Sequence, residues 1–137
     1  MSAPLRLSPG SELPAWAEAL DELVFGKAWG ALEGHEYLLG LQPYAFARWG
    51  VIPAAQEAEL LRLAVAPEAR RQGLARTLLE ASERFLAQEG ITTLHLEVRV
   101  GNEPARALYE AMGWRPQHKR KAYYADGEDA MVYAKEL

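Results

Sequence analysis

Hydrophobic and polar residues along the chain follow two periods, one typical of β-strands and one typical of amphipathic helices. Short apolar or alternating runs predict strands at 4–7, 37–41, 44–52, 59–65, 92–100, 114–121 and 130–137. Apolar residues at helical spacing predict helices at 13–25, at 73–88 and between Asn102 and Gly113. This order predicts one domain, residues 1–137, of mixed α/β or α+β class built on a single sheet.

The region after the first predicted helix is less regular. Gly26, Gly30 and Gly34 interrupt it, so any second helical piece there is expected to be short. Further on, the pair Gln42-Pro43 is the expected turn between two neighbouring strands.

The strand at 92–100 divides its side chains clearly between two faces. One face carries only aliphatic side chains: Leu94, Leu96, Val98 and Val100. The other face carries polar side chains: His95, Glu97 and Arg99. After this strand, Asn102 is a residue of N-cap type with Glu103-Pro104 behind it, which predicts the start of the last helix.

Composition excludes several kinds of chemistry. The 137 residues suit one sizeable core, and with no cysteine there is no disulfide, thiolate nucleophile or cysteine metal site. The three histidines lack metal-ligand spacing, so we expect no metal. No apolar run approaches the ~20 residues of a membrane span, and Met1 to Gly10 lacks a signal-peptide pattern. The expected location is therefore cytoplasmic, without a membrane partner.

The net charge of −4 disfavours direct nucleic-acid binding by a basic surface. Charge is nevertheless uneven, with one basic cluster at Arg70, Arg71 and Arg76 and a second at residues 118–121. Local clusters in an acidic chain indicate either specific charged ligands or simply solvated surface.

The first basic cluster lies where a strand gives way to the most regular helix, in the segment Arg70-Arg71-Gln72-Gly73-Leu74-Ala75-Arg76. A helix N-terminus leaves backbone N–H groups unpaired and carries partial positive charge, so a pyrophosphate fits there if the backbone is accessible. Gly73 and the small Ala75 permit that approach. The alternative is an ordinary basic helix start with a glycine kept for packing. Neither GxxxxGK[ST] nor GxGxxG is present.

Two stretches resemble the GNAT superfamily of acetyltransferases. Leu63-Ala64-Val65-Ala66-Pro67 followed by residues 70–75 is similar to its acetyl-CoA-binding motif, [QR]xxGx[GA] after a hydrophobic strand. Leu96-Glu97-Val98-Arg99, Asn102, Leu108-Tyr109-Glu110 and the closing Tyr123-Tyr124 with residues 126–130 resemble the RimI subgroup. The resemblance covers about residues 57–137.

The resemblance implies a mostly antiparallel sheet with a splayed parallel strand pair, flanked by helices. It also implies a coenzyme, acetyl-CoA, whose pantetheine arm runs along Leu63, Ala64 and Val65, with the Val65 N–H as oxyanion donor. Its pyrophosphate would lie at the 70–76 turn, and Asn102 and Tyr109 would contact it further along.

Acetyl transfer to an amine needs a base and a proton donor. Glu97 is the candidate base by resemblance, and the alternative is a surface carboxylate paired with Arg99 or a lysine. His95 is a rival base on the same face, and Glu59 is a lesser candidate. Tyr109 is the candidate acid by resemblance; its position on an apolar stripe equally suits a core aromatic.

The resemblance implies transfer of acetyl to a protein N-terminal α-amine, with the N-terminal alanine of a ribosomal protein as the expected target. Asp126, Glu128 and Asp129 would then receive a cationic peptide, unless they form only a solvated turn. The alternatives are a GNAT enzyme acting on a small amine or a lysine side chain, and a non-catalytic acyl-CoA-binding module. The residues before Glu57 depart most from the family pattern, which leaves the acceptor the least defined.

Overall fold

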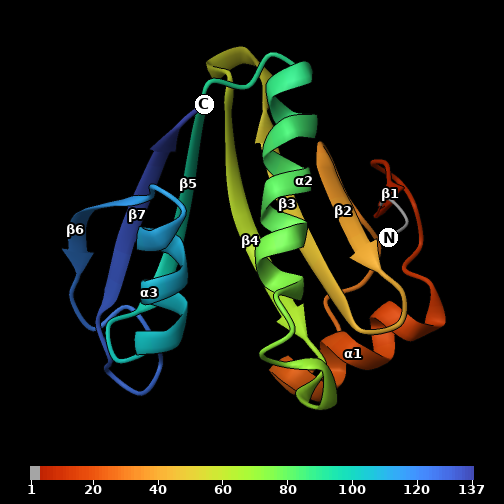
Figure 1. Ribbon diagram of the computed structural model, residues 1–137, viewed down its shortest axis with the longest axis horizontal. Helices are drawn as coiled ribbons and strands as arrows, with labels where there is room; N and C mark the ends of the chain where they lie inside the picture. The colour runs from red at the N-terminus through yellow and green to blue at the C-terminus, as the bar shows by residue number, and fades with distance from the viewer. Residues whose placement is uncertain (1–3) are drawn as a thin grey trace.

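Seven strands hydrogen-bond into one mixed sheet in a computed structural model that describes residues 4–137 (Figure 1). Their order across the sheet is β1-β2-β3-β4-β5-β7-β6. The strands are β1 (Leu5–Leu7), β2 (Glu36–Leu41), β3 (Ala45–Ile52), β4 (Glu57–Val65), β5 (Thr93–Arg99), β6 (Arg115–Arg120) and β7 (Ala130–Glu136). Each strand predicted from the sequence is present, with ends that differ by a few residues at most.

Helices cover both faces of this sheet. They are α1 (Ala15–Phe25), α2 (Leu74–Gln88) and α3 (Glu103–Ala111), with single 3₁₀ turns at Pro53–Ala55 and Pro67–Ala69. Alternate residues of the same strands join different core clusters: Leu38 and Phe46 pack with α1, whereas Leu39 and Ala47 pack with α2. The fold is therefore α+β, as predicted. No helix within residues 4–137 has the length and apolar composition needed to cross a bilayer.

The parallel pair β4 and β5 is the shortest pairing among the long strands at the centre of the sheet. It is paired only from Glu57 and Thr93 to Leu60 and Leu96, and beyond this point β4 pairs with β3 alone. At the same place the register with β3 shifts, because Trp49 pairs with Leu60 and Arg48 with Arg62. Such a bulge leaves one residue of β4 without a partner and bends the strand. The predicted splayed parallel pair is thus confirmed, and Figure 1 shows the two strands diverging.

The segment between α1 and β2 contains no second helix in the structure. Gly26, Gly30 and Gly34 in this segment all adopt positive φ, at 83°, 104° and 55°. Left-handed residues at this spacing cannot be part of a right-handed helix, so the expected short helical piece is absent.

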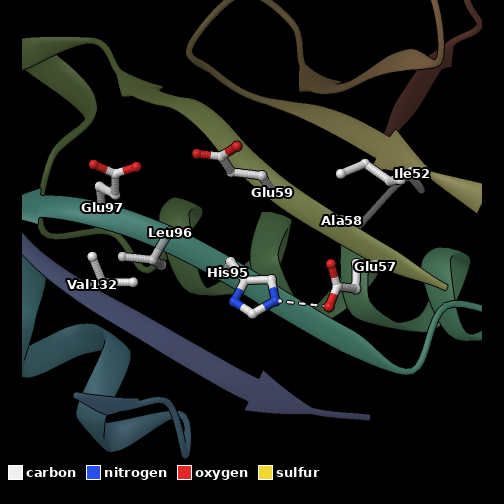
Figure 2. A pocket seen from close by; sticks show the side chains of 8 residues that line it. All are labelled: Ile52, Glu57, Ala58, Glu59, His95, Leu96, Glu97 and Val132. Atoms are coloured by element: carbon white, nitrogen blue, oxygen red, sulfur yellow. Dashed lines mark ion pairs between the residues drawn. The ribbon is translucent and has the colours of Figure 1, made fainter. Parts of the chain in front are cut away.

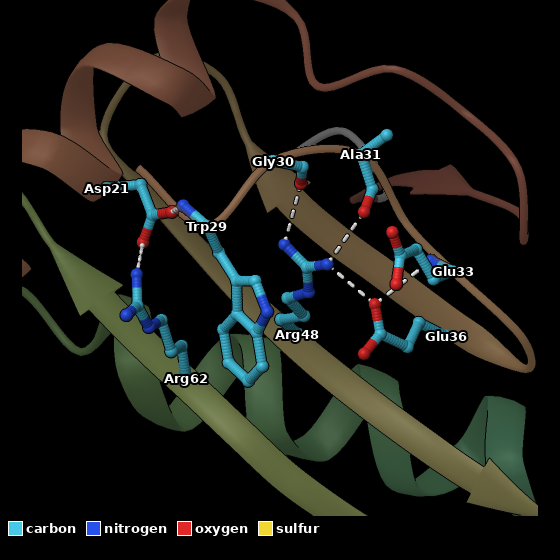
Figure 3. A network of polar contacts seen from close by, with 8 residues as sticks. All are labelled: Asp21, Trp29, Gly30, Ala31, Glu33, Glu36, Arg48 and Arg62. Carbon is cyan, nitrogen blue, oxygen red and sulfur yellow. Dashed lines mark hydrogen bonds and ion pairs between the residues drawn. The ribbon is translucent and has the colours of Figure 1, made fainter. Parts of the chain in front are cut away.

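The buried side chain of Arg48 on β3 holds this irregular segment in place (Figure 3). Its guanidinium donates to the carbonyl oxygens of Gly30 and Ala31, both at 2.9 Å, and pairs with Glu36 at 2.6 Å. Because a planar guanidinium presents several donors in a fixed geometry, one side chain replaces the backbone hydrogen bonds that a helix would have made.

A second arginine also holds the segment between α1 and β2 against the sheet. Arg62 of β4 pairs with the buried Asp21 of α1 at 2.7 Å, and Asp21 also accepts the backbone N–H of Trp29 at 2.7 Å (Figure 3). The Trp29 ring then lies between two guanidinium groups, 4.5 Å from that of Arg48 and 4.8 Å from that of Arg62. Cation–π contacts of this kind fix the indole beside β4.

Candidate active site

A shallow cavity of about 210 Å³ lies over the seam between β4 and β5 (Figure 2). The polar residues in its lining come from two adjacent strands: Glu57 and Glu59 from β4, and His95 and Glu97 from β5. The rest of the lining is Ile52, Ala58, Leu96 and Val132. Period-two alternation explains the polar part of this lining, because the same strands send Leu60 and Leu94 into the core on the opposite face.

The three carboxylates create a negative field along the seam. Burial raises the pKa of Glu59, and the nearby charge of Glu97 raises it further, while His95 and Arg120 act in the opposite direction. His95 Nε2 is 3.5 Å from a Glu57 oxygen, so the rival base is held by a neighbour at the outer end of the cavity. This field attracts a cationic amine to the seam.

Glu97 lies where β4 and β5 separate, on the face predicted for it. Its carboxylate is mostly buried, and both of its oxygens accept from one nitrogen of Arg120, at 3.2 and 3.3 Å. The sequence-based alternative of a pairing with Arg99 is wrong, because Arg99 instead pairs with Asp126 and Glu128 at 2.8 and 2.9 Å.

Tyr109 approaches from the other face of the sheet. It is 6% exposed, on α3, and packs against the rings of Trp114 and Tyr133. Burial raises its pKa to about 12, with a further contribution from Tyr124. The pKa of Tyr124 is itself raised, mainly by burial and in part by Glu97. Tyr109 is therefore both a core aromatic and a phenol that stays protonated at neutral pH.

The predicted phosphate turn has the expected geometry. Gly73 is the N-cap of α2 with φ 75°, and Arg71 also has a positive φ of 65°. No side chain within the described chain caps this helix, and a Cβ built on Gly73 meets nothing within 4 Å. Backbone N–H groups in such a turn form a concavity suited to anions.

The side chains of this turn have partners that the sequence did not indicate. Arg70 donates from Nε to the Val65 carbonyl at 3.3 Å, and Arg76 pairs with Glu80 at 3.0 Å. Gln72 makes a long contact of 3.5 Å with the Glu68 carbonyl. Arg71 is exposed.

The edge of β4 that faces the seam presents backbone N–H groups. Ala66 donates its N–H to Tyr44, on the β3 side. Since successive N–H groups of a strand point in opposite directions, the N–H groups of Val65 and Leu63 point toward the seam. Ala64, between them, is buried with the α1 cluster.

Asn102 is confirmed as an N-cap, because its side chain accepts the Ala105 N–H at 3.2 Å. The acidic residues near the C-terminus differ from expectation, since they bond within the chain. Besides holding Arg99, Glu128 accepts the Gly101 N–H at 2.9 Å and Asp129 accepts the Ala122 N–H at 2.8 Å. These carboxylates shape the β6–β7 loop, and the idea that they directly receive a cationic peptide loses support.

Sequence reasoning missed the contact between Arg120 and Glu97. Arg120 belongs to the basic cluster noted at 118–121, but it is 23 positions from Glu97 in the sequence. The two side chains meet because the strand order β5-β7-β6 brings β6 within one strand of β5. The Asp21–Arg62 pair was missed for the same reason, since it joins α1 to β4.

The sheet, its seam and the phosphate-type turn define the fold of an acetyltransferase, and the comparison of sequences agrees. The model of the "Acetyltransferase (GNAT) family" matches residues 6–114, so the chain belongs to the GNAT family.

Known N-acetyltransferases are similar to this chain. The [ribosomal protein bS18]-alanine N-acetyltransferase of Escherichia coli K12 is 47% identical over 81 residues, covering 57% of this chain and 55% of that protein. An N-alpha-acetyltransferase of Saccharolobus solfataricus is 38% identical over 103 residues, covering 74% and 62%. The chain thus spans little more than half the length of these curated relatives. The crystal structure of the ribosomal-protein-S18-alanine N-acetyltransferase from Escherichia coli superposes with a TM-score of 0.72 at 30% identity, covering 97% and 94%.

The raised pKa of Tyr109 makes the stability of the fold depend on alkaline pH. In the unfolded chain a tyrosine ionises near 10, so the folded state holds its proton more tightly and gains stability that is complete below pH 10. This stability is lost as pH rises through about 12. Between pH 9 and 12, the free energy of unfolding of the parent should fall by about 2–3 kcal/mol more than that of Tyr109→Phe, as measured by urea denaturation. Tyr44→Phe, at an exposed position, is the control, and identical pH slopes for the two variants would contradict the assignment.

Proposed function

We propose that this protein is an N-acetyltransferase that moves the acetyl group of acetyl-CoA to the α-amine of a protein N-terminus. The observation that carries the proposal is the open seam with Glu97 at its mouth, in a chain of the GNAT family. The names of its relatives support an α-amine acceptor, and those of the Escherichia coli enzymes support the N-terminal alanine of a ribosomal protein, which implies action in the cytoplasm.

Enzymes of this family use acetyl-CoA, and the residues present fit it. The accessible backbone at Gly73 suits a pyrophosphate, with Arg71 close by in the same turn. The free edge at Leu63 and Val65 suits the amides of the pantetheine arm, which would pair with it as an added strand. We assign the remaining contacts to Ala64, Arg70, Gln72, Leu74, Ala75, Arg76, Asn102 and Tyr109.

Acetyl-CoA supplies an activated acetyl group as a thioester, and the protein supplies the groups that make the attack possible. A free α-amine has a pKa near 8, so it arrives mostly as ammonium and must lose a proton. Glu97 is the proposed base, because it faces the cavity where the strands separate. The Val65 N–H, on the edge of β4 that faces the seam, is the proposed donor to the developing oxyanion. Tyr109, protonated at neutral pH, is the proposed donor to the departing sulfur, and the second proton that the nitrogen loses as the amide forms restores its phenol.

Glu59 is the second candidate for the base. The observation in its favour is the raised pKa, which brings a carboxylate nearer to the operating pH of a general base. Its Cα pairs with that of His95, in the still-closed part of the seam, so it lies further from the opening than Glu97. We therefore assign it the role of attracting the acceptor ammonium.

Two other functions remain as alternatives. A GNAT enzyme acting on a small amine or a lysine side chain would have the same seam and differ at the acceptor side. A non-catalytic acyl-CoA-binding module would bind the coenzyme and leave every amine unchanged.

The acceptor class is tested by incubating the protein with acetyl-CoA and a panel of amines, with free CoA measured as product. We expect the highest kcat/KM for peptides with a free N-terminal alanine, and little turnover of N-acetylated peptides with internal lysine, of polyamines or of aminoglycosides. Preference for a small amine would replace the proposal by the first alternative. Coenzyme binding without any turnover would favour the second.

The coenzyme site is tested by Gly73→Asp, which places a side chain and a negative charge at the start of α2. We expect acetyl-CoA affinity to fall by about 100-fold or more, because the anion would meet a like charge instead of free N–H groups. The φ of 75° at Gly73 strains any side chain, which an aspartate at a helix N-terminus partly offsets, and thermal unfolding will verify that the variant is folded. Gly90→Asp is the matched control, at another open position with positive φ just beyond the other end of α2. Calorimetry showing equal affinities for both variants would place the pyrophosphate elsewhere.

The base is tested by Glu97→Gln, which keeps shape and hydrogen bonding but removes basicity. We expect kcat near neutral pH to fall by about 100-fold or more and to recover in part as pH rises, because more amine is then neutral. Glu57→Gln removes a carboxylate from the same cavity and should cost far less, as should His95→Ala. A larger loss from Glu59→Gln or His95→Ala than from Glu97→Gln would move the base to that residue.

A further inference from the structure

Arg120 occupies a position at the active site that neither the mechanism above nor the family resemblance uses. One guanidinium nitrogen lies almost equally far from the two oxygens of Glu97, at 3.2 and 3.3 Å, so it sits in front of the carboxylate. An acceptor ammonium, which carries the same charge and the same kind of donor, would seek this same place.

The other cations around the seam are held elsewhere. Arg99 is paired with Asp126 and Glu128, and Arg62 is paired with Asp21. His95 contacts Glu57. Within the described residues, Arg120 is therefore the cation that pairs with Glu97.

The contact between Arg120 and Glu97 can be separated at little cost. Arg120 is 50% exposed and comes from β6, an edge strand whose residues are all exposed. Its guanidinium also lies 4.2 Å from the centre of the Tyr123 ring, which gives the side chain a place to stay when it leaves the carboxylate. Exposed ion pairs contribute little to stability, so displacement costs little.

We propose that Arg120 takes the place of the acceptor ammonium: its guanidinium pairs with Glu97 in the free enzyme and moves aside when the acceptor binds. The inference rests on the proposed function. The acceptor arrives as a cation and competes with Arg120 for the carboxylate. Once acetylated, its nitrogen is a neutral amide that no longer competes. Glu97, which has taken a proton from the acceptor, releases it to solvent, and Arg120 then returns to the carboxylate as the product leaves.

The experiment compares binding of two peptides to the protein with saturating CoA, by calorimetry. One peptide has a free N-terminal alanine, and the other is the same peptide N-acetylated. In Arg120→Gln we expect the free-amine peptide to bind about 2- to 5-fold more tightly, the scale of an exposed ion pair. The acetylated peptide should bind as it does to the parent, because it does not need Glu97.

Kinetics with acetyl-CoA provide the second readout, in which KM for the free-amine peptide should fall by the same factor with kcat nearly unchanged. Lys119→Gln is the matched control: it removes the same charge from the neighbouring position of β6, whose side chain points to the opposite face. Arg120→Lys, which keeps the charge, should restore most of the parental KM. Both positions are exposed, and thermal unfolding will verify that the variants are folded.

A shift of equal size for both peptides would overturn the proposal, since Arg120 would then shape the groove without competing for the carboxylate. A fall in kcat at constant KM would also overturn it and make Arg120 a positioning residue for Glu97. If the parent acetylates no peptide, the proposed function fails first, and the inference fails with it.

Discussion

The separation of β4 from β5 is the constraint on which the rest of the site depends. Four paired residues on each strand join the two parts of the sheet, and the strands then diverge after Leu60 and Leu96. The divergence turns a buried strand into an edge at Leu63 and Val65 and opens the sheet beside Glu97. Unpaired backbone groups are costly inside a protein, so this edge is a binding surface for a partner that can act as a strand.

Different forces hold the two sides of the opening. On the side of β4, buried ion pairs from Arg48 and Arg62 attach the segment after α1, with Trp29 stacked between them. On the side of β5, the more exposed ion pairs of Arg99 and Arg120 shape the loop between β6 and β7. Because buried pairs are far harder to separate than exposed ones, the first wall is rigid and the second can adjust to a ligand.

Much of this was predictable where the cause is local. Alternation along β5 predicted which face carries Glu97, and helix-capping chemistry predicted Asn102 as an N-cap. The separated strand pair came from the family resemblance, since no local pattern encodes it. The partners of Glu97, Asp21 and Arg48 could not be predicted, because these pairs depend on strand order and on a glycine-rich segment without a periodic pattern. For the same reason, the sequence left open whether the acidic residues at 126–129 face a ligand or form a turn, and in the structure they bond to their own chain.

The short pairing between β4 and β5 also determines how the two parts of the sheet are held together. The β1–β4 part and the β5–β7 part are joined by few backbone hydrogen bonds, and their cohesion comes mainly from the shared core around Leu78, Leu94 and Tyr109. Side-chain packing tolerates small sliding movements better than a continuous ladder of hydrogen bonds does. A molecule that bridges Leu63 and Val65 to the opposite strand therefore acts as a mechanical brace, and part of its binding free energy is folding free energy. Substrate binding and the integrity of the sheet are in this way thermodynamically linked.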